Sequence, residues 1–160
     1  MSSRGETVGY LLDTVVFNRL VDLDIDPKTV ARAGRIYVTH IQGDELQATR
    51  RPERAAALLR AFQEVEREQI PTAAAVWNVS KYGEAEWGDA DGGYGRMLES
   101  LNRRNSSKSN NAQDVLTAIT ALRRGLTLVT DDADLAAVLR EFAGRALSFS
   151  EFAACFAADR

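Results

Sequence analysis

Short apolar runs, each bounded by polar residues, recur along the chain. They lie at residues 8–12 (VGYLL), at 35–39 (RIYVT), between Gly125 and Asp131 (LTLVT), and at 146–149 (ALSF). Continuous apolar runs of this length are typical of strands buried on both faces, as in a parallel sheet. A weaker, alanine-rich run at residues 72–77 is a further strand candidate.

Amphipathic segments separate these runs and predict helices, because apolar residues recur in them at helical spacing. The expected helices lie at residues 15–21, 27–34, 40–48, 53–69, 96–104, 133–142 and 150–158, with another from Asn111 to Gly125. Thr14 is placed to cap the first helix, and Pro71 to stop the helix at 53–69. The glycine-rich, acidic residues 78–95 are expected to form an irregular, solvated loop.

The alternation of strands and helices predicts the fold class. Connections too long for hairpins imply right-handed crossovers and helices on both faces of the sheet. We therefore expect an α/β protein: a three-layer α/β/α sandwich around a central, mainly parallel sheet of about five strands. Residues 1–160 form one domain in this interpretation, with a frayed start at 1–7 and the segment 78–110 as an irregular loop and short basic helix.

Composition excludes several classes of protein. One cysteine and one histidine in 160 residues leave no disulfide framework or zinc cluster within the chain. No apolar run approaches the roughly 18 residues of a membrane span, and residues 1–7 lack the apolar core of a signal peptide. A cytoplasmic protein is the expectation. The net charge of −3 argues against a protein that only coats polyanions, but not against a metal nuclease.

Four carboxylates recur at one kind of position. Asp13 ends the first strand, Glu45 lies in the helix after the second, Asp114 lies in the first turn of a helix, and Asp132 follows the last strong strand. The carboxyl ends of parallel strands meet at one edge of a sheet, where ligands bind in open α/β folds. Each acid alone could be a helix cap or a helix-dipole residue. Their joint pattern favours a shared acidic site.

Such a cluster needs a compensating charge. At ~4 Å two carboxylates repel by about 4 kcal/mol at a protein-surface dielectric. A hard cation with oxygen ligands, Mg²⁺ or Mn²⁺, removes this cost. It also lowers the pKa of bound water and stabilises charge on a phosphate. The chemistry indicated is hydrolysis of a phosphodiester by metal-activated water, without a covalent intermediate.

Three stretches carry a resemblance to a known family: LLDTVVF, THIQGDEL and NAQDVLTAITALRRGLTLVTDDADL. Together they resemble the PIN-domain nucleases, in particular the VapC-like toxins of toxin–antitoxin pairs, over about residues 8–149. The resemblance implies a Mg²⁺- or Mn²⁺-dependent endoribonuclease with a parallel sheet. It also implies a homodimer that is silenced by a small cognate antitoxin protein.

The resemblance assigns roles by motif. Asp13, Glu45, Asp114 and Asp132 match the four acids, Asp131 is the off-by-one alternative for the fourth, and Thr14 and Thr130 match hydroxyls that orient ligands or water. Val15 departs from the family, which usually has Asn or Ser at that position. Loss of such a supporting hydrogen bond can cost 10–100-fold in metal affinity or activity.

A basic segment precedes the third acid. Arg96, Arg103, Arg104 and Lys108 stand against Glu99, which gives a local positive excess on an acidic protein. These four residues are predicted to contact RNA phosphates. The alternative is a solvated helix face.

Two other classes compete with the nuclease. A catalytically weak PIN-like module that binds RNA or a protein partner is motivated by Val15. A phosphoacceptor domain of the receiver type needs an acidic pair after its first strand and a late lysine. The stretch LLDTVV offers a single acid, and no lysine follows a late strand, which disfavours the receiver.

Overall fold

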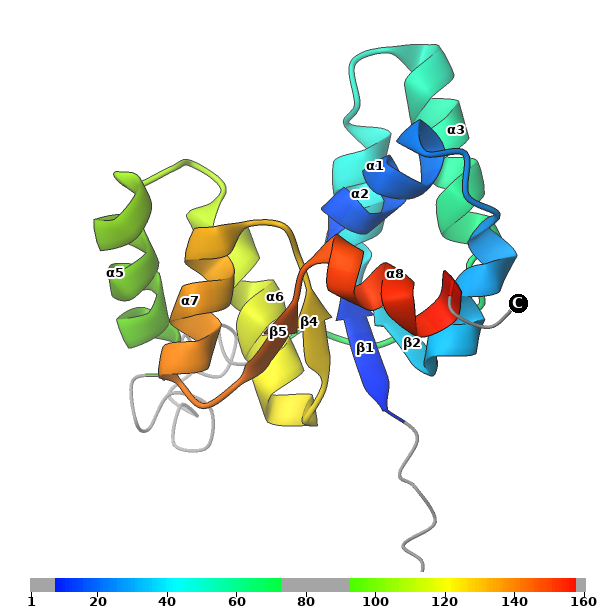
Figure 1. Ribbon diagram of the computed structural model, residues 1–160. Helices are drawn as coiled ribbons and strands as arrows, with labels where there is room; N and C mark the ends of the chain where they lie inside the picture. The colour runs from blue at the N-terminus through cyan, green and yellow to red at the C-terminus, as the bar shows by residue number, and fades with distance from the viewer. Residues whose placement is uncertain (1–7, 73–92, 158–160) are drawn as a thin grey trace, which may run out of the picture.

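Parallel strands form the centre of the computed structural model, which describes residues 8–72 and 93–157 (Figure 1). The sheet has five strands in the order β3-β2-β1-β4-β5, and every pairing is parallel. The strands are β1 Gly9–Leu12, β2 Arg35–Val38, β3 Glu68–Gln69, β4 Thr127–Val129 and β5 Arg145–Leu147. The predicted parallel sheet of about five strands is therefore confirmed, and the carboxyl ends of its strands share one edge.

Helices cover both faces of this sheet, as predicted. One face carries α1 Thr14–Asp22, the 3-10 helix η1 Pro27–Ala33, α3 Pro52–Glu64 and α8 Phe149–Ala157. The other face carries α5 Gly93–Asn105, α6 Asn111–Arg124 and α7 Ala133–Glu141. Helix α2 His40–Gln47 follows the carboxyl end of β2 and packs against α1 and α3. The architecture is a three-layer α/β/α sandwich.

Side chains of β1 alternate between two hydrophobic cores. Tyr10 and Leu12 belong to the core under α1, α3 and α8, whereas Leu11 belongs to the core under α5, α6 and α7. Both leucines are fully buried. Burial on both faces explains why this strand has a continuous apolar sequence and not an alternating one.

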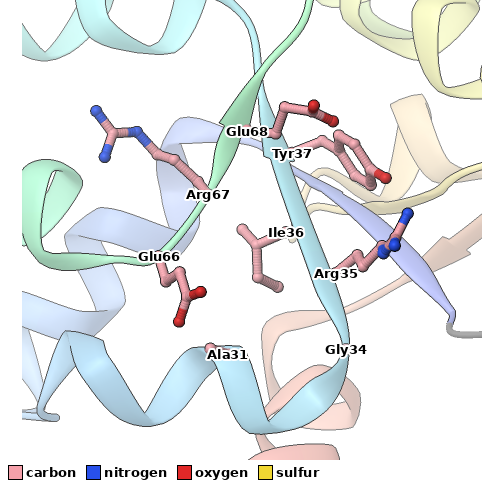
Figure 2. Close-up of a pocket in the computed structure, with 8 residues that line it drawn as sticks. All are labelled: Ala31, Gly34, Arg35, Ile36, Tyr37, Glu66, Arg67 and Glu68. Atoms are coloured by element: carbon pink, nitrogen blue, oxygen red, sulfur yellow. The ribbon is translucent and has the colours of Figure 1, made fainter.

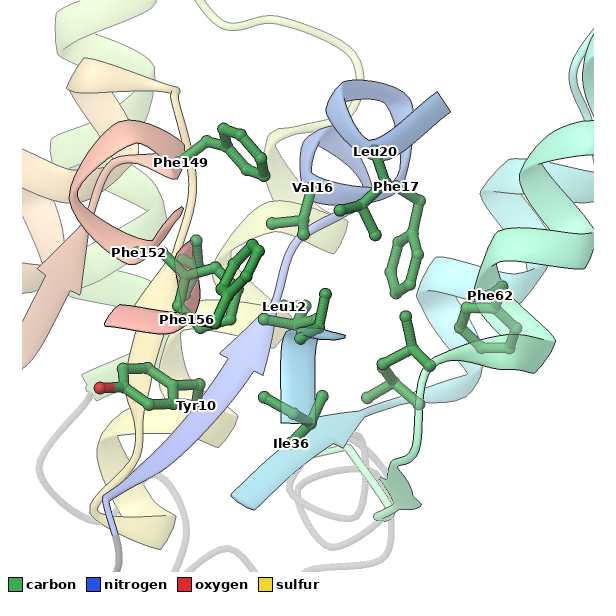
Figure 3. Packing of buried hydrophobic residues seen from close by; sticks show 14 of the residues in the cluster. Tyr10, Leu12, Val16, Phe17, Leu20, Ile36, Phe62, Phe149, Phe152 and Phe156 are labelled. Carbon is green, nitrogen blue, oxygen red and sulfur yellow. The ribbon is translucent and has the colours of Figure 1, made fainter. Parts of the chain in front are cut away.

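Aromatic rings fill the first core (Figure 3). Phe152 of α8 meets Tyr10 of β1 at 5.0 Å between ring centroids and Phe156 at 5.3 Å. Phe17 of α1 meets Phe62 of α3 at 5.1 Å. All three contacts are edge-to-face, the arrangement that aromatic pairs prefer. The Tyr10–Phe152 contact joins α8 to the sheet, and the Phe17–Phe62 contact joins α1 to α3.

Two predicted boundaries are wrong: the start of α1 and the end of α3. Asp13, and not Thr14, caps α1: its Oδ1 accepts the Thr14 N–H at 2.8 Å, and Thr14 is already helical. The helix expected over 53–69 ends at Glu64, because Val65 turns to an extended conformation and buries its side chain. The chain then pairs with β2 through Glu68 and Gln69, which supply the fifth strand.

Other expectations shift by a few residues. Residues 93–95 belong to α5, which is longer than the predicted 96–104 helix. The last strand ends at Leu147, and Phe149 begins α8, because Ser148 and Glu151 form a reciprocal cap at its start. Within the described part, no helix is long and apolar enough to span a membrane. Residues 1–7, 73–77 and most of the loop expected at 78–95 lie outside the described residues.

The ends of α6 and α7 give a first test of the fold. Both helices end in a left-handed residue, Gly125 and Ala143, each with φ 66°. Ala143→Gly should raise the free energy of unfolding by about 0.5–1 kcal/mol, because glycine adopts this conformation without steric cost. Gly125→Ala should lower it by about 1 kcal/mol, since a Cβ there meets no atom within 4 Å and only the conformation is penalised. Chemical denaturation measures both; shifts of the same sign would contradict the assignment.

Candidate active site

Asp13 stands at the junction of β1 and α1, at the carboxyl edge of the sheet. Its backbone N–H donates to the Val129 carbonyl at 3.0 Å, which continues the pairing of β1 with β4. Its side chain accepts the Thr14 N–H on Oδ1 at 2.8 Å and the Thr130 hydroxyl on Oδ2 at 2.8 Å. Burial raises the pKa of Asp13, the bonds from Thr130 and Thr14 oppose that rise, and the charge of Asp132 adds to it. The carboxyl is rigidly held and sensitive to its charged surroundings.

Thr130 connects this carboxyl to the next acid. The residue is 2% exposed and directly follows β4. Its hydroxyl donates to Asp13 and accepts the Asp132 N–H at 3.1 Å. Asp132 in turn caps α7, because its Oδ1 accepts the N–H groups of Asp134 and Leu135 at 3.0 and 3.1 Å. The sequence Thr-x-Asp thus fixes Asp132 beside Asp13.

Asp131 has a different role. Its Oδ2 pairs with Arg19 Nε at 3.0 Å, and its Oδ1 accepts the Phe149 N–H at 2.8 Å. These bonds join α1 and the start of α8 to the loop after β4. The charge of Asp132, in contrast, acts on both Asp13 and Asp114. The geometry therefore favours Asp132 over Asp131 as the fourth acid of the site.

Glu45 reaches the same edge from α2. Its Oε2 accepts the Thr14 hydroxyl at 3.0 Å, so Thr14 lies between Glu45 and Asp13. Burial raises the pKa of Glu45, the Thr14 hydrogen bond lowers it, and the charge of Asp13 raises it. Hydrogen bonds through Thr14 and Thr130 thus join three of the predicted acids into one network.

A buried polar contact holds α2 against α6. Thr39 and Gln42 form a capping box at the start of α2, in which the Gln42 Oε1 accepts the Thr39 N–H at 2.7 Å. The Gln42 amide then donates to the Thr117 hydroxyl of α6 at 3.4 Å. Glu45 and Asp114 lie one helical turn from Gln42 and Thr117 on their helices, so this contact brings them toward each other. Sequence reasoning missed Gln42, although the spacing Thr39-x-x-Gln42 is a capping-box signal.

Asp114 completes the group from the first turn of α6. Burial, followed by the charges of Asp13, Glu45 and Asp132, raises its pKa to about 7, against a smaller lowering by Lys108. The Asn110 amide donates to its Oδ2 at 3.2 Å. Each of the other three acids contributes to this shift, so all three lie within electrostatic reach of Asp114.

The four residues predicted to contact RNA differ in their surroundings. Arg104 forms an ion pair with Glu141 of α7 at 2.7 Å, and Arg103 lies 3.8 Å from Glu99 in its own helix. Arg96 is exposed on α5. Lys108 is the member of this group whose charge acts on Asp114. Arg104 is thus engaged in joining α5 to α7, whereas Lys108 lies toward the acids.

An asparagine cluster shapes the turn that carries Lys108. Asn111 is 2% exposed, and its amide donates to the Asn102 and Asn105 side-chain oxygens at 2.7 Å each. Ser106 and Ser107 both adopt φ 59°, the left-handed region. This tight reversal delivers the chain from the end of α5 to the start of α6. The buried asparagine that begins α6 and organises this turn was not predicted from the sequence.

The donor set can be compared with what a cation requires. All four acids offer oxygen ligands, which suit Mg²⁺ or Mn²⁺. Within residues 8–72 and 93–157, no three His, Cys, Asp or Glu side chains lie close enough together to hold one ion. Mg²⁺ usually takes one or two carboxylates and keeps several waters, so a pair such as Asp13 and Asp132 is sufficient. The raised pKa of Asp114 fits the same group, because nearby carboxylates destabilise each other's ionised forms.

A pocket of about 420 Å³ lies elsewhere, around the amino end of β2 (Figure 2). It is lined by Ala31, Gly34, Arg35, Ile36, Tyr37, Glu66, Arg67 and Glu68. The Arg67 guanidinium stacks on the Phe62 ring at 4.2 Å. None of the four gathered acids lines this pocket, so it is separate from the site at the carboxyl edge.

Fold and site together define an α/β sandwich with a parallel sheet and a cluster of four acidic residues at the carboxyl edge of that sheet. No family model matches the chain, and no curated protein matches it. Among solved structures, the chain is similar to PAE2754 from Pyrobaculum aerophilum, with a TM-score of 0.54 and 18% sequence identity. The similarity covers 95% of this chain and 91% of that one. At this identity it supports the fold alone.

Proposed function

We propose that this protein is a metal-dependent endoribonuclease of the PIN-domain type that hydrolyses RNA phosphodiesters. The observation that carries the proposal is the coupling of Asp13, Glu45, Asp114 and Asp132 at the carboxyl edge, with the pKa of Asp114 raised to about 7. A group of like charges in one place is unfavourable for the fold alone. It is useful where a cation and a phosphate are to be bound.

The roles of the residues follow from their contacts. The chemistry that Mg²⁺ or Mn²⁺ supplies when bound is a water of lowered pKa and charge stabilisation at the phosphate. Asp13 and Asp132 would hold the cation, because Thr130 fixes both. Glu45 and Asp114 would accept protons or orient water at this edge of the sheet. Thr14 keeps Glu45 oriented through its 3.0 Å hydrogen bond.

The biological setting is part of the same proposal. By their resemblance to VapC-like sequences, the motifs around these acids favour the toxin of a toxin–antitoxin pair. A small antitoxin protein, a homodimer and a cytoplasmic location belong to that assignment. A neighbouring small open reading frame for a DNA-binding antitoxin would support it.

The test is RNA cleavage by purified protein with Mg²⁺ or Mn²⁺. We expect cleavage that stops with a chelator and returns with excess metal. Asp13→Asn should remove it, whereas Asp134→Asn, the same change two positions beyond Asp132, should retain it. Equal cleavage by wild type and Asp13→Asn would indicate a contaminating nuclease and contradict the proposal.

A second candidate is a catalytically weak PIN-like module that binds RNA or a protein partner. The observation in its favour is Val15, whose side chain packs against the first hydrophobic core and offers no hydrogen bond to the site. This candidate predicts RNA or partner binding without cleavage under either metal. The same assay therefore separates the two.

Lys108 provides a prediction about RNA contact. Lys108→Glu should weaken RNA binding and reduce the slope of log affinity against log salt by about 1, the loss of one phosphate contact. Arg104→Glu should leave that slope unchanged and lower stability, because Arg104 is paired with Glu141. Filter binding at several salt concentrations measures both slopes. An unchanged slope for Lys108→Glu would remove this residue from the RNA surface.

A further inference from the structure

A pocket of about 320 Å³ lies between α2 and α6 and adjoins the cluster of four acidic residues. Glu45 lines it, and so does Gln113, the residue before Asp114. A chemical group seated in this pocket would therefore lie directly beside a phosphate positioned at the acids. In a nucleic acid the group beside a phosphate is a nucleoside. The volume is at the lower end of the range of about 300–1,000 Å³ seen for small-molecule sites, which suits a single base.

The walls of the pocket have an apolar part and a polar part. Ile41 of α2 and Leu116 of α6 line it and offer apolar surface to a flat ring. The polar lining residues are His40, Asp44, Glu45, Thr72 and Gln113. The carboxylates of Asp44 and Glu45 also line the pocket. An ionised carboxylate only accepts hydrogen bonds, and it can accept two parallel ones from a single planar partner. The two carboxylates thus favour a planar ring with adjacent donors, and His40, Thr72 and Gln113 can donate to an acceptor on the same ring.

We propose that this pocket binds a guanine base next to the scissile phosphate and gives the enzyme its base preference. Guanine presents two adjacent donors, N1–H and the N2 amino group, on its Watson–Crick edge. Adenine and cytosine present an amino group beside a bare acceptor nitrogen, which faces a carboxylate unfavourably. Uracil presents a single N3–H donor flanked by two carbonyl oxygens, which a carboxylate repels. This inference rests on the proposed ribonuclease function and adds the specificity of the same site.

A guanidinium group from a protein partner has similar donors and is the main competitor for this pocket. The location favours the base, because the proposed substrate must lie across the adjoining acids. The apolar walls favour it as well, since a nucleobase buries both faces of a ring. Comparing the binding of arginine amide with that of guanosine monophosphate separates the two ligands.

The test maps cleavage of a random-sequence RNA pool by the full chain with Mg²⁺ or Mn²⁺. We expect guanosine at one fixed position beside the cut, favoured about tenfold over the other bases. Inosine, which lacks the N2 amino group, should lose most of that preference. Ala48→Phe, which fills the pocket, and Asp44→Asn should reduce the guanosine preference at least severalfold. Gln47→Phe, on the same helix but outside the pocket lining, should retain it.

Direct binding makes the result independent of cleavage. By NMR titration, guanosine monophosphate should bind wild type more tightly than the adenosine and uridine monophosphates, and Ala48→Phe should abolish the difference. Cleavage without a guanosine preference, or a preference unaffected by both pocket variants, would overturn the pocket assignment but not the ribonuclease. Absence of cleavage would overturn the ribonuclease, and the pocket would then stand or fall on the titration. Tighter binding of arginine amide than of guanosine monophosphate would overturn the base in favour of a partner's cationic side chain.

Discussion

Asp114→Asn is expected to lower metal-dependent RNA cleavage by at least about 100-fold and, without metal, to stabilise the folded protein at pH 8. The loss of activity follows because a charge in the proposed cation and phosphate site contributes several kcal/mol, at 1.36 kcal/mol per tenfold in rate. The gain in stability follows from burial and from the charges of Asp13, Glu45 and Asp132, which raise the pKa of Asp114 to about 7.

The sign of the pH effect is fixed by that shift. Below pH 3.8, the unperturbed pKa, Asp114 is protonated in both folded and unfolded chains and its contribution is favourable. Between the unperturbed pKa of 3.8 and about 7, the unfolded chain has released the proton that the folded chain keeps, so stability falls as the pH rises. Above about pH 7 the folded chain is ionised as well, and the loss is complete. We expect on the order of 1–2 kcal/mol, because Asp114 is partly exposed and solvent screens its charge.

Denaturation of metal-free wild type and Asp114→Asn at pH 4 and pH 8 measures this effect. Relative to wild type, the free energy of unfolding of the variant should be higher at pH 8 than it is at pH 4. Added Mg²⁺ or Mn²⁺ should stabilise wild type at pH 8 by mass action and the variant less. Asp134→Asn serves as the matched control and should show neither behaviour. A variant less stable than wild type at pH 8 would mean that Asp114 serves the fold and not the site.

Thr130→Val is expected to lower cleavage by about 10–100-fold and stability by about 1–3 kcal/mol. The substitution keeps the shape of the side chain but removes the hydroxyl that donates to Asp13 and accepts the Asp132 N–H. Both partners then lose a hydrogen bond in a buried place. Removing the Thr130 bond also raises the pKa of Asp13 further, which weakens its binding of a cation.

Thr130→Ser is the matched control, because it restores the hydroxyl and removes only a methyl group. When the cleavage rate is measured over a titration with metal, Thr130→Ser should cleave at nearly the wild-type rate and Thr130→Val far more slowly. Equal losses in both variants would assign Thr130 to packing, with no part in orienting Asp13.

The sequence predicted the layers of the fold because burial leaves a direct mark on it. A strand such as β1, with Leu11 and Leu12 in opposite cores, reads as one apolar run. The two-residue strand β3 leaves no such mark, since Glu68 and Gln69 are exposed and pair with β2 only through the backbone. It was therefore assigned to the preceding helix. Pairing of this kind depends on the neighbouring strand and cannot be read from local pattern.

The sequence could predict which acidic residues lie near one edge of the sheet, but not which contacts each of them makes. Strand ends and the first turn of α6 placed Asp13, Asp114 and Asp132 near one edge. Sequence could not separate Asp132 from Asp131, because the difference is made by Arg19 and the Phe149 N–H, which are far away in the chain. Nor could it show that Arg104 is paired with Glu141. Both distinctions arise from tertiary contacts between segments that are unrelated in sequence.

The strand order carries a consequence for how this protein assembles. From β1 the chain proceeds outward through β2 and β3, then returns to the other side of β1 for β4 and β5. The four acids divide evenly across this reversal: Asp13 and Glu45 precede it, and Asp114 and Asp132 follow it. The Thr130–Asp13 hydrogen bond joins residues 117 positions apart. Neither half of the chain can form the site by itself. A cation bound there would therefore stabilise only the state in which both halves are folded.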